Sequence, residues 1–263
     1  MEKIHPEHAK DFANPYKIAL IATKDSEGEM HISLISTLMA KGEDRMMCGE
    51  FIVGLSKEYF HQYPESGFII MNLKKEFWSG KMKFRDEISI AGEDFDLFNS
   101  MPLYRYNSYF GINKVHYADL VEISDKRALD MGGIIFNTLK VLAAKPFVKC
   151  KQKNILKPWA KSLTTKADTL MFLAYEGQDG YPEIVPIIQG QSVCASRIVF
   201  TAAPYKKELS NLKKGAKASV YAVNLKMEAV LIKGVFTGFK NGIGSVEIQR
   251  VYNPMPPKHG YIY

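Results

Sequence analysis

The residue pair with the clearest chemistry in this chain is Ser56-Lys57, in the segment GLSKEYFHQYP. The pattern of this segment predicts a helix that begins at the pair. A hydroxyl, an ammonium and free backbone amides would then lie together, and a phosphate dianion binds such charge-assisted donors. The alternative is a helix cap followed by a solvated lysine. Both interpretations stay open at this point.

Other residue patterns that carry catalysis are missing from the sequence. It contains no GxSxG, GxGxxG, GxxxxGKS/T, HExxH or calcium-loop pattern. The six histidines have no spacing that indicates a metal site, so we expect surface or hydrogen-bonded roles for them. Cys48, Cys150 and Cys194 are odd in number and form no CxxC, so we expect three reduced thiols, without a disulfide or a zinc site.

The elements that position Ser56-Lys57 belong to a pattern that occurs twice. Residues 17–35 read KIALIATKDSEGEMHISLI and residues 169–187 read TLMFLAYEGQDGYPEIVPI, at a constant offset of 152. Each copy has an apolar strand, a polar turn that ends in glycine, and a second strand. This arrangement predicts a β-hairpin in both places.

Further matches follow in the same order along both copies. The stretch with Lys57 corresponds to YKKELSNLKKG, which contains Lys206 and Lys207. Gly80 corresponds to Gly234, and each copy ends on the triplet Val-Glu-Ile, at 121–123 and at 246–248. The ordered series of matches predicts a tandem duplication.

The fold class predicted is mainly β. The predicted strands are rich in Ile, Val, Phe and Tyr, which suit a pleated, half-buried surface. They cover 17–24, 30–37, 45–53, 67–73, 77–90 with a break near Arg85, and 115–124, then 170–175, 183–189, 197–201, 216–223, 227–239 and 245–252. Six strands and one small helix per copy predict two tandem antiparallel split barrels, each closed or nearly closed.

Three domains are expected: a first barrel over 1–125, a connecting helix and lysine-rich linker over 126–166, and a second barrel over 167–263. The helix is predicted to start at Ser124 or Asp125, to end near Ala144, and to act as a spacer between the barrels. An amphipathic helix that lies on a surface is the alternative. Between Asp86 and Lys114 the first copy carries an aromatic insertion, which predicts either a lid or a cover for the barrel.

Charge and hydropathy indicate where the protein is located and which partners it could face. The net charge of +7 divides into −5 over residues 1–100 and +12 over residues 101–263. Eight lysines and no acidic residue lie between Asp130 and Asp168, which indicates a solvated connector or a surface that faces anions. No stretch approaches the roughly 18 apolar residues of a membrane helix, and the polar N-terminus lacks a signal sequence, so we expect a cytoplasmic protein.

The sequence resembles the pyridoxamine 5′-phosphate oxidase-like, FMN-binding split-barrel superfamily. The resemblance rests on IATKDSEGEMHISLI, on Ser56-Lys57 at a helix start and on the strand through Trp78-Ser79-Gly80, and it covers each copy once. It implies that FMN lies in a groove between two barrels. The two copies of one chain would form a pseudo-dimer in place of two subunits, and a homodimer of chains is also open.

The resemblance also implies the residues that contact the cofactor. Ser33, Ser36 and Thr37 would lie near the ring or the ribityl chain, Ser56 and Lys57 would bind the phosphate, and Trp78 would approach the isoalloxazine. An aromatic residue in such a place adds roughly 0.5–1.5 kcal/mol beyond its buried area. In the second copy Lys206 and Lys207 keep the charge, but Val185 and Ile188 replace the serines.

The function expected from this resemblance is that of an FMN-dependent oxidoreductase acting on a small molecule, with NAD(P)H as a possible donor. Pyridoxamine phosphate is not the expected substrate, because the chain ends YNPMPPKHGYIY and lacks the Trp- and Arg-containing end of those oxidases. The alternative is a non-catalytic module that holds flavin, haem or F420. We expect neither nucleic acid nor a membrane as a partner.

Overall fold

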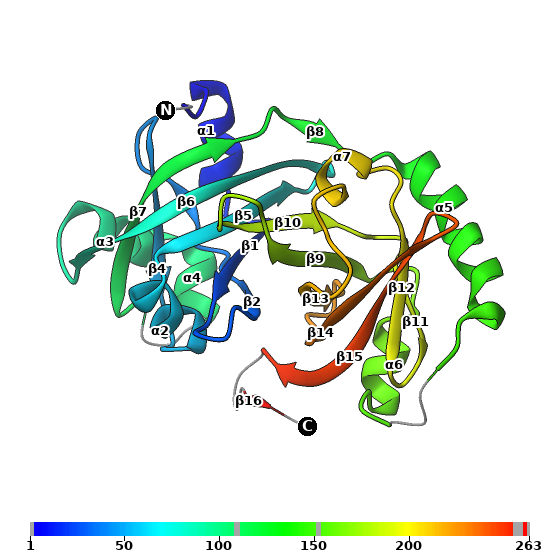
Figure 1. Ribbon diagram of the computed structural model, residues 1–263. Coiled ribbons are helices and arrows are strands. Elements are labelled where there is room, and N and C mark those ends of the chain that lie inside the picture. The colour runs from blue at the N-terminus through cyan, green and yellow to red at the C-terminus, as the bar shows by residue number, and fades with distance from the viewer. Residues whose placement is uncertain (1–2, 108–110, 151–153, 255–259, 262–263) are drawn as a thin grey trace. The chain divides into compact units, whose positions relative to one another are not determined.

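The computed structural model describes residues 3–107, 111–150, 154–254 and 260–261 (Figure 1). Its backbone divides into two compact units. The first comprises residues 1–25, 33–128 and 181–183, and the second comprises residues 26–32, 129–180 and 184–263. Each unit therefore includes one short segment from the other half of the chain. Lys151 and Lys153 of the basic stretch lie outside the described residues.

The first unit is built on an antiparallel sheet with the strand order β2-β1-β5-β6-β7-β4-β3, and β8 pairs with β6. No ladder among the described residues joins the end strands β2 and β3, so the sheet stays open, as a split barrel does. The strands are β1 (Lys17–Lys24), β2 (Met30–Leu34), β3 (Met39–Ala40), β4 (Arg45–Glu50), β5 (Glu65–Asn72), β6 (Glu76–Ser89), β7 (Lys114–Ile123) and β8 (Arg127–Ala128).

The second unit has the order β10-β9-β13-β14-β15-β12-β11, with β16 paired to β15. This is the order of the first sheet, strand for strand. Its strands are β9 (Leu170–Glu176), β10 (Pro182–Pro186), β11 (Gln191–Cys194), β12 (Arg197–Thr201), β13 (Lys217–Val223), β14 (Ala229–Lys240), β15 (Ile243–Asn253) and β16 (Gly260–Tyr261). The mainly β class is thus confirmed. Each sheet adds two short strands to the six that were predicted.

The helices of the described residues cover these sheets or connect them. They are α1 (Pro6–Ala13), α2 (Leu55–Gln62), α3 (Glu93–Ser100), α4 (Pro102–Asn107), α5 (Met131–Ala144), α6 (Pro158–Leu163) and α7 (Lys206–Leu209), with a 3-10 turn η1 (Lys145–Phe147). None of the helices in this part of the chain is long and apolar enough to cross a membrane.

Equivalent positions in the two sheets meet the same local constraints. A Cβ atom on Gly80 would lie 2.2 Å from the carbonyl oxygen of Glu122, and one on Gly234 would lie 2.1 Å from that of Glu247. Both glutamates are the centres of the Val-Glu-Ile triplets. Only glycine allows the neighbouring strands to approach so closely, and this explains why glycine and triplet occur together in each copy.

A second shared feature is the turn after β5 and after β13. The segments Asn72-Leu73-Lys74-Lys75-Glu76 and Asn224-Leu225-Lys226-Met227-Glu228 both begin with asparagine and end with glutamate. In each, the asparagine Oδ1 accepts from two backbone amides and its Nδ2 donates to the glutamate. The fourth residue of each turn has a left-handed φ, 65° or 61°. This match at the offset of 152 was missed in the sequence.

The aromatic insertion covers one face of the first sheet. Phe98 of α3 and Tyr104 of α4 are buried in a cluster with residues of β3, β4 and β7. The hydroxyl of Tyr104 donates to the carbonyl of Ser36 at 2.7 Å. The insertion therefore acts as a cover for the sheet in this structure. Residues 108–110 of the insertion lie outside the described residues.

The helix between the copies starts later than predicted. Its N-cap is Asp130, whose side chain accepts from the amide of Gly133 at 2.8 Å. Ser124 and Asp125 do not start the helix, because β7 continues to Ile123 and β8 then pairs with β6. The predicted end near Ala144 is confirmed.

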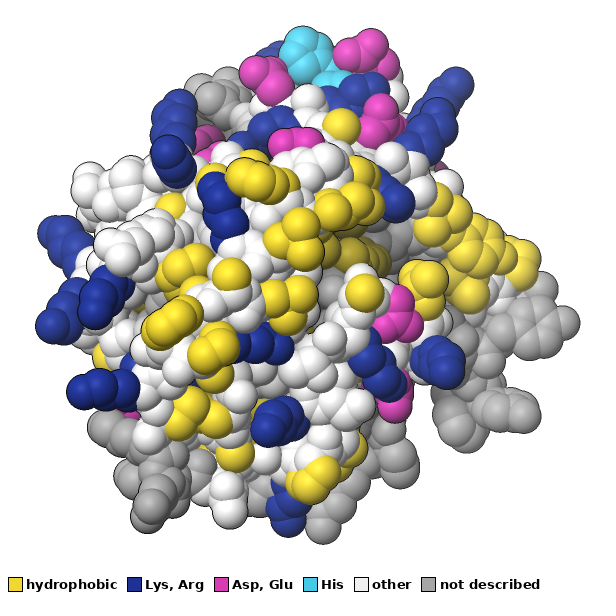
Figure 2. Space-filling model, turned by 90° about the vertical axis from the view of Figure 1, so that its right-hand side faces the viewer, with side chains coloured by type: hydrophobic (Ala, Val, Ile, Leu, Met, Phe, Trp, Pro, Cys, Tyr) yellow, Lys and Arg dark blue, Asp and Glu magenta, His cyan; other side chains and the backbone are white. Residues whose placement is uncertain are grey.

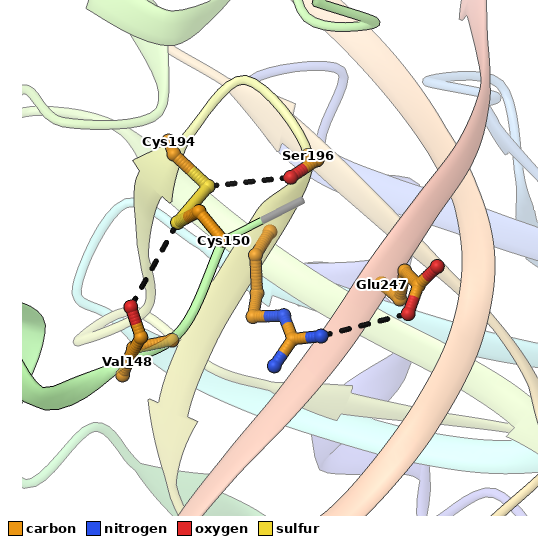
Figure 3. The surroundings of a disulfide bond; sticks show 6 residues. Val148, Cys150, Cys194, Ser196 and Glu247 are labelled. Carbon is orange, nitrogen blue, oxygen red and sulfur yellow. Dashed lines mark hydrogen bonds and ion pairs between the residues drawn. A yellow bond between two sulfur atoms is a disulfide. The ribbon is translucent and has the colours of Figure 1, made fainter. Parts of the chain in front are cut away.

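The prediction of three reduced thiols is wrong for two of the cysteines. Cys150 and Cys194 form a disulfide, which joins the segment after η1 to the β11–β12 hairpin (Figure 3). The Oγ of Ser196 lies 3.4 Å from the sulfur of Cys194. Cys48 is free and buried. The pair is 44 residues apart in sequence, so the fold alone brings its members together.

Candidate functional site

Strand β4 positions the charged cluster of the first unit through its alternation. Met46 and Cys48 point to the inner side of the sheet, into the main core of the first unit. Met47 points to the other side and packs toward α3 and α4. Glu50 follows in register on the inner side because side chains alternate along a strand. It is buried at the end of this core. A charged side chain in such a place requires partners.

One partner of Glu50 is His116 on the neighbouring strand β7. The Nε2 atom of His116 lies 2.9 Å from Oε2 of Glu50, and Nε2 donates because a carboxylate can only accept. This hydrogen bond lowers the pKa of Glu50 below its ordinary value. The ring of Phe60 from α2 packs edge-on against His116, with centroids 5.1 Å apart. The pair is thus buried, with the rings of Phe60 and His61 from α2 packed on His116.

Lys57 enters the same cluster from α2. The helix buries Ser56, Lys57 and Phe60 on one face, and only 9% of Lys57 is exposed. Burial lowers the pKa of the Lys57 ammonium, while the nearby Cys48 and Glu50 act in the opposite direction. No carboxylate among the described residues forms an ion pair with Lys57. The cluster therefore holds a buried cation without a bonded anion.

The start of α2 adds hydrogen-bond donors beside Lys57. Its N-cap is Gly54, which has no side chain to cap the first amides, and the amide of Lys57 donates to the Gly54 carbonyl. The first amides of a helix carry partial positive charge. Together with Lys57, this end of α2 can bind an anion. Cys48 is not a nucleophile here, because burial raises its thiol pKa to about 12.

The structure brings some of the predicted site residues to this cluster. The hydroxyl of Thr37 donates to the carbonyl of Gly49 at 2.8 Å, next to Cys48 and Glu50. Ser56 is buried on α2, and the half-buried Ser33 and Ser36 lie on or just after β2. Sequence reasoning missed Glu50 and His116. A charged residue at the end of an alternating strand was the available signal for Glu50.

The other predicted residues lie elsewhere. Trp78 is fully buried in the core of the first unit, where its ring packs on Phe12 and His8 of α1 at centroid distances of 5.2 Å. The core and α1 together therefore cover the Trp78 ring. Lys206 and Lys207 are exposed on α7 of the second unit, and so lack the buried setting of Lys57. The cofactor roles of these three residues stay predictions.

No protein-family model and no curated protein matches the chain. Among solved structures, it is similar to an FMN-binding protein from Syntrophomonas wolfei, at 17% identity and a TM-score of 0.38, over 47% of this chain and 86% of that one. An F420 reductase matches at 9% identity and a TM-score of 0.34, over 46% and 98% of the two chains. A heme-binding protein from Mycobacterium smegmatis matches at 10% identity and a TM-score of 0.29, over 93% and 89%.

Proposed function

We propose that the chain is a tandemly duplicated split-barrel flavoprotein and that its first unit binds the phosphate of FMN at Lys57. The buried, unpaired ammonium of Lys57 carries this proposal. The identical strand order of the two sheets supports the duplication, in which both copies come from one ancestral unit. The proposed binding of the FMN phosphate is supported by Lys57 and by the start of α2.

A bound phosphate would offset the desolvation cost of the buried Lys57 ammonium. Burying an ammonium without an anion is unfavourable, which is why the pKa of Lys57 is lowered. A phosphate at the start of α2 would give the Lys57 ammonium a hydrogen-bonded anion and would also accept hydrogen bonds from the helix amides. The residues present fit the phosphate. Trp78 supplies no free face for the ring in this structure.

The second unit is proposed to take a supporting role. It has Val185 and Ile188 at the positions of Ser33 and Ser36, and its Lys206 and Lys207 are exposed. An exposed lysine pays little desolvation cost and gains little from one more anion. We therefore expect one FMN for each chain, and we propose that the two units of one chain act as an intramolecular pseudo-dimer.

The reaction proposed is a flavin-dependent oxidation or reduction of a small molecule, with NAD(P)H as the donor. Bound FMN supplies the hydride or electron transfer, and the protein supplies position and electrostatics. The alternative is a module that binds flavin, haem or F420 without turnover. Stopped-flow mixing of the FMN-loaded protein with NADH or NADPH separates the two, because an oxidoreductase reduces its flavin rapidly and a carrier does not.

The binding proposal is tested by titrating the protein with FMN and with riboflavin, which lacks the phosphate. A hydrogen-bonded charge contributes about 1.5–3 kcal/mol, so Lys57→Met should weaken FMN binding by about 10- to 150-fold. Riboflavin affinity should not change. Lys206→Met is the matched control and should bind FMN like the wild type. Equal FMN affinity in Lys57→Met, with its circular dichroism unchanged, would refute the proposal.

A further inference from the structure

Helix α5 of the second unit has two apolar faces, and only one of them is buried. Ile134 and Val141 are buried on the side that packs against β12. On the other side Ile135, Phe136 and Leu139 remain 62%, 59% and 60% exposed. A surface helix of a soluble protein normally presents polar residues to solvent. The outward face of α5 is therefore an unusual feature.

The exposed apolar surface extends along and beyond the helix. Met131 and Leu142 are exposed at its two ends, each about one turn from the residues above. Phe147 in η1 is 87% exposed, and Trp159 in α6 is half-exposed. Figure 2 views the side on which α5 lies in Figure 1, and hydrophobic side chains gather there with lysine and arginine side chains around them. Exposed apolar side chains gathered in this way mark interaction surfaces.

Within the stretch that contains this patch, residues 131–167, all eight charged side chains are lysines, and Asp130 precedes it as the N-cap of α5. The ammonium of Lys140 lies 4.4 Å from the centre of the Phe136 ring. The pKa of Lys145 is lowered, first by burial and then by the nearby positive charge of Lys161. Lys149, Lys157 and Lys161 are exposed. The patch is therefore a ridge of apolar side chains bordered by cations.

We propose that α5, η1 and α6 form a docking surface for a membrane that contains anionic lipids. Apolar side chains on a helix with a basic border insert shallowly between lipid headgroups, while the lysines contact the anionic headgroups. The 14 residues of α5 span about 21 Å, less than the roughly 30 Å of a bilayer core, so the helix would lie in the interface. This assignment is independent of the cofactor. It replaces both the spacer role predicted for the helix and the expectation from the sequence that no membrane is a partner.

A second copy of the chain is a poorer occupant for this surface. Two copies that meet through α5 would bring both lysine borders together, and residues 131–167 contain eight lysines and no acidic side chain, with Asp130 as the acidic residue at the start of the helix. An anionic membrane supplies the complementary charge. Like charges at an interface oppose self-association, whereas each lysine near an anionic bilayer favours binding.

The test is co-sedimentation of the full chain with vesicles of phosphatidylcholine alone and of phosphatidylcholine and phosphatidylserine in equal parts. Binding is expected only to the mixed vesicles and should weaken as salt shortens the Debye length. Leu139→Asp should lower the partition coefficient at least about tenfold, and Lys149→Gln about fivefold. Leu73→Asp is the matched control, since Leu73 is also exposed beside a lysine, and should bind like the wild type.

Three results would overturn the proposal. The first is equal binding to both kinds of vesicle, or binding to neither. The second is a Leu139→Asp variant that binds like the wild type. The third is light scattering that shows a dimer which Leu139→Asp dissociates, because the surface would then belong to a second copy. Lys149→Gln keeps the test decisive if Leu139→Asp fails to fold, since this exposed position supports no core packing.

Discussion

Replacing Glu29 by glutamine is expected to destabilise the second unit strongly. Glu29 belongs to the segment 26–32, which clusters with this unit. Its carboxylate lies 2.6 Å from the guanidinium of Arg250 on β15 and 3.5 Å from the ammonium of Lys233 on β14. The side chains of Glu29 and Lys233 are 7% and 1% exposed. The substitution keeps the size of the side chain and removes only its charge.

The magnitude follows from the burial of the pair. Two charges 3.5 Å apart attract with about 5 kcal/mol at an effective dielectric constant of about 20, and the desolvation of both groups offsets part of this. Removing one partner exposes the remaining charge to that desolvation cost without its main compensation. We expect a loss of about 3 kcal/mol in the free energy of unfolding. This corresponds to a fall in Tm of roughly 6–12 °C for a protein of this size.

The assay is thermal unfolding followed by circular dichroism, with Glu27→Gln as the control. Glu27 also contacts Arg250, at 3.3 Å, but its side chain is 65% exposed, so its pair is worth at most about 1 kcal/mol. The double variant Glu29→Gln/Lys233→Met should recover part of the loss, because it removes both buried charges. A Glu29→Gln variant no less stable than Glu27→Gln would refute this reasoning.

Three further predictions concern other parts of the fold. The hydrogen bond from His116 keeps the pKa of Glu50 below its ordinary 4.5. The contribution of Glu50 to stability is therefore present above that value and is lost as the pH falls through the folded-state pKa. Glu50→Gln should flatten the acid limb of the stability curve against pH, and an unchanged limb would contradict the pairing. Gly234→Ala should cost about 1–3 kcal/mol in urea unfolding, because its Cβ would lie 2.1 Å from the Glu247 carbonyl, and a neutral effect would argue against the close approach. Thiol titration of the unfolded chain should find one thiol, Cys48, before reduction and three afterwards, whereas three before reduction would show that the disulfide does not form.

Strand positions could be predicted from the sequence because apolar alternation and β-branched residues report directly on a half-buried strand. The predicted strand 17–24 coincides with β1, and 197–201 coincides with β12. The two-residue strands β3 and β8 were missed, since so short a segment shows no periodicity. The start of α5 was also missed, because the pairing of β8 with β6 is a long-range contact.

The candidate site was predicted only in its local part. The helix start at Ser56-Lys57 follows from neighbouring residues, and the structure places α2 there. The burial of Lys57 and its approach to Glu50 depend on which strands become neighbours, and the β4–β7 ladder joins residues about 70 positions apart. The same limit applies to Cys150 and Cys194. The local spacing of residues does not show which distant residues become neighbours in the fold.

The most direct test of the proposed function is the flavin content of the purified chain after incubation with excess FMN and gel filtration. Absorbance of the flavin and of the protein gives the ratio of cofactor to chain. We predict one FMN per chain for the wild type and for Lys206→Met, and a clearly lower ratio for Lys57→Met, in line with its weaker binding. A colourless wild type, or a Lys57→Met variant that retains one FMN, would contradict the assignment of the phosphate to Lys57.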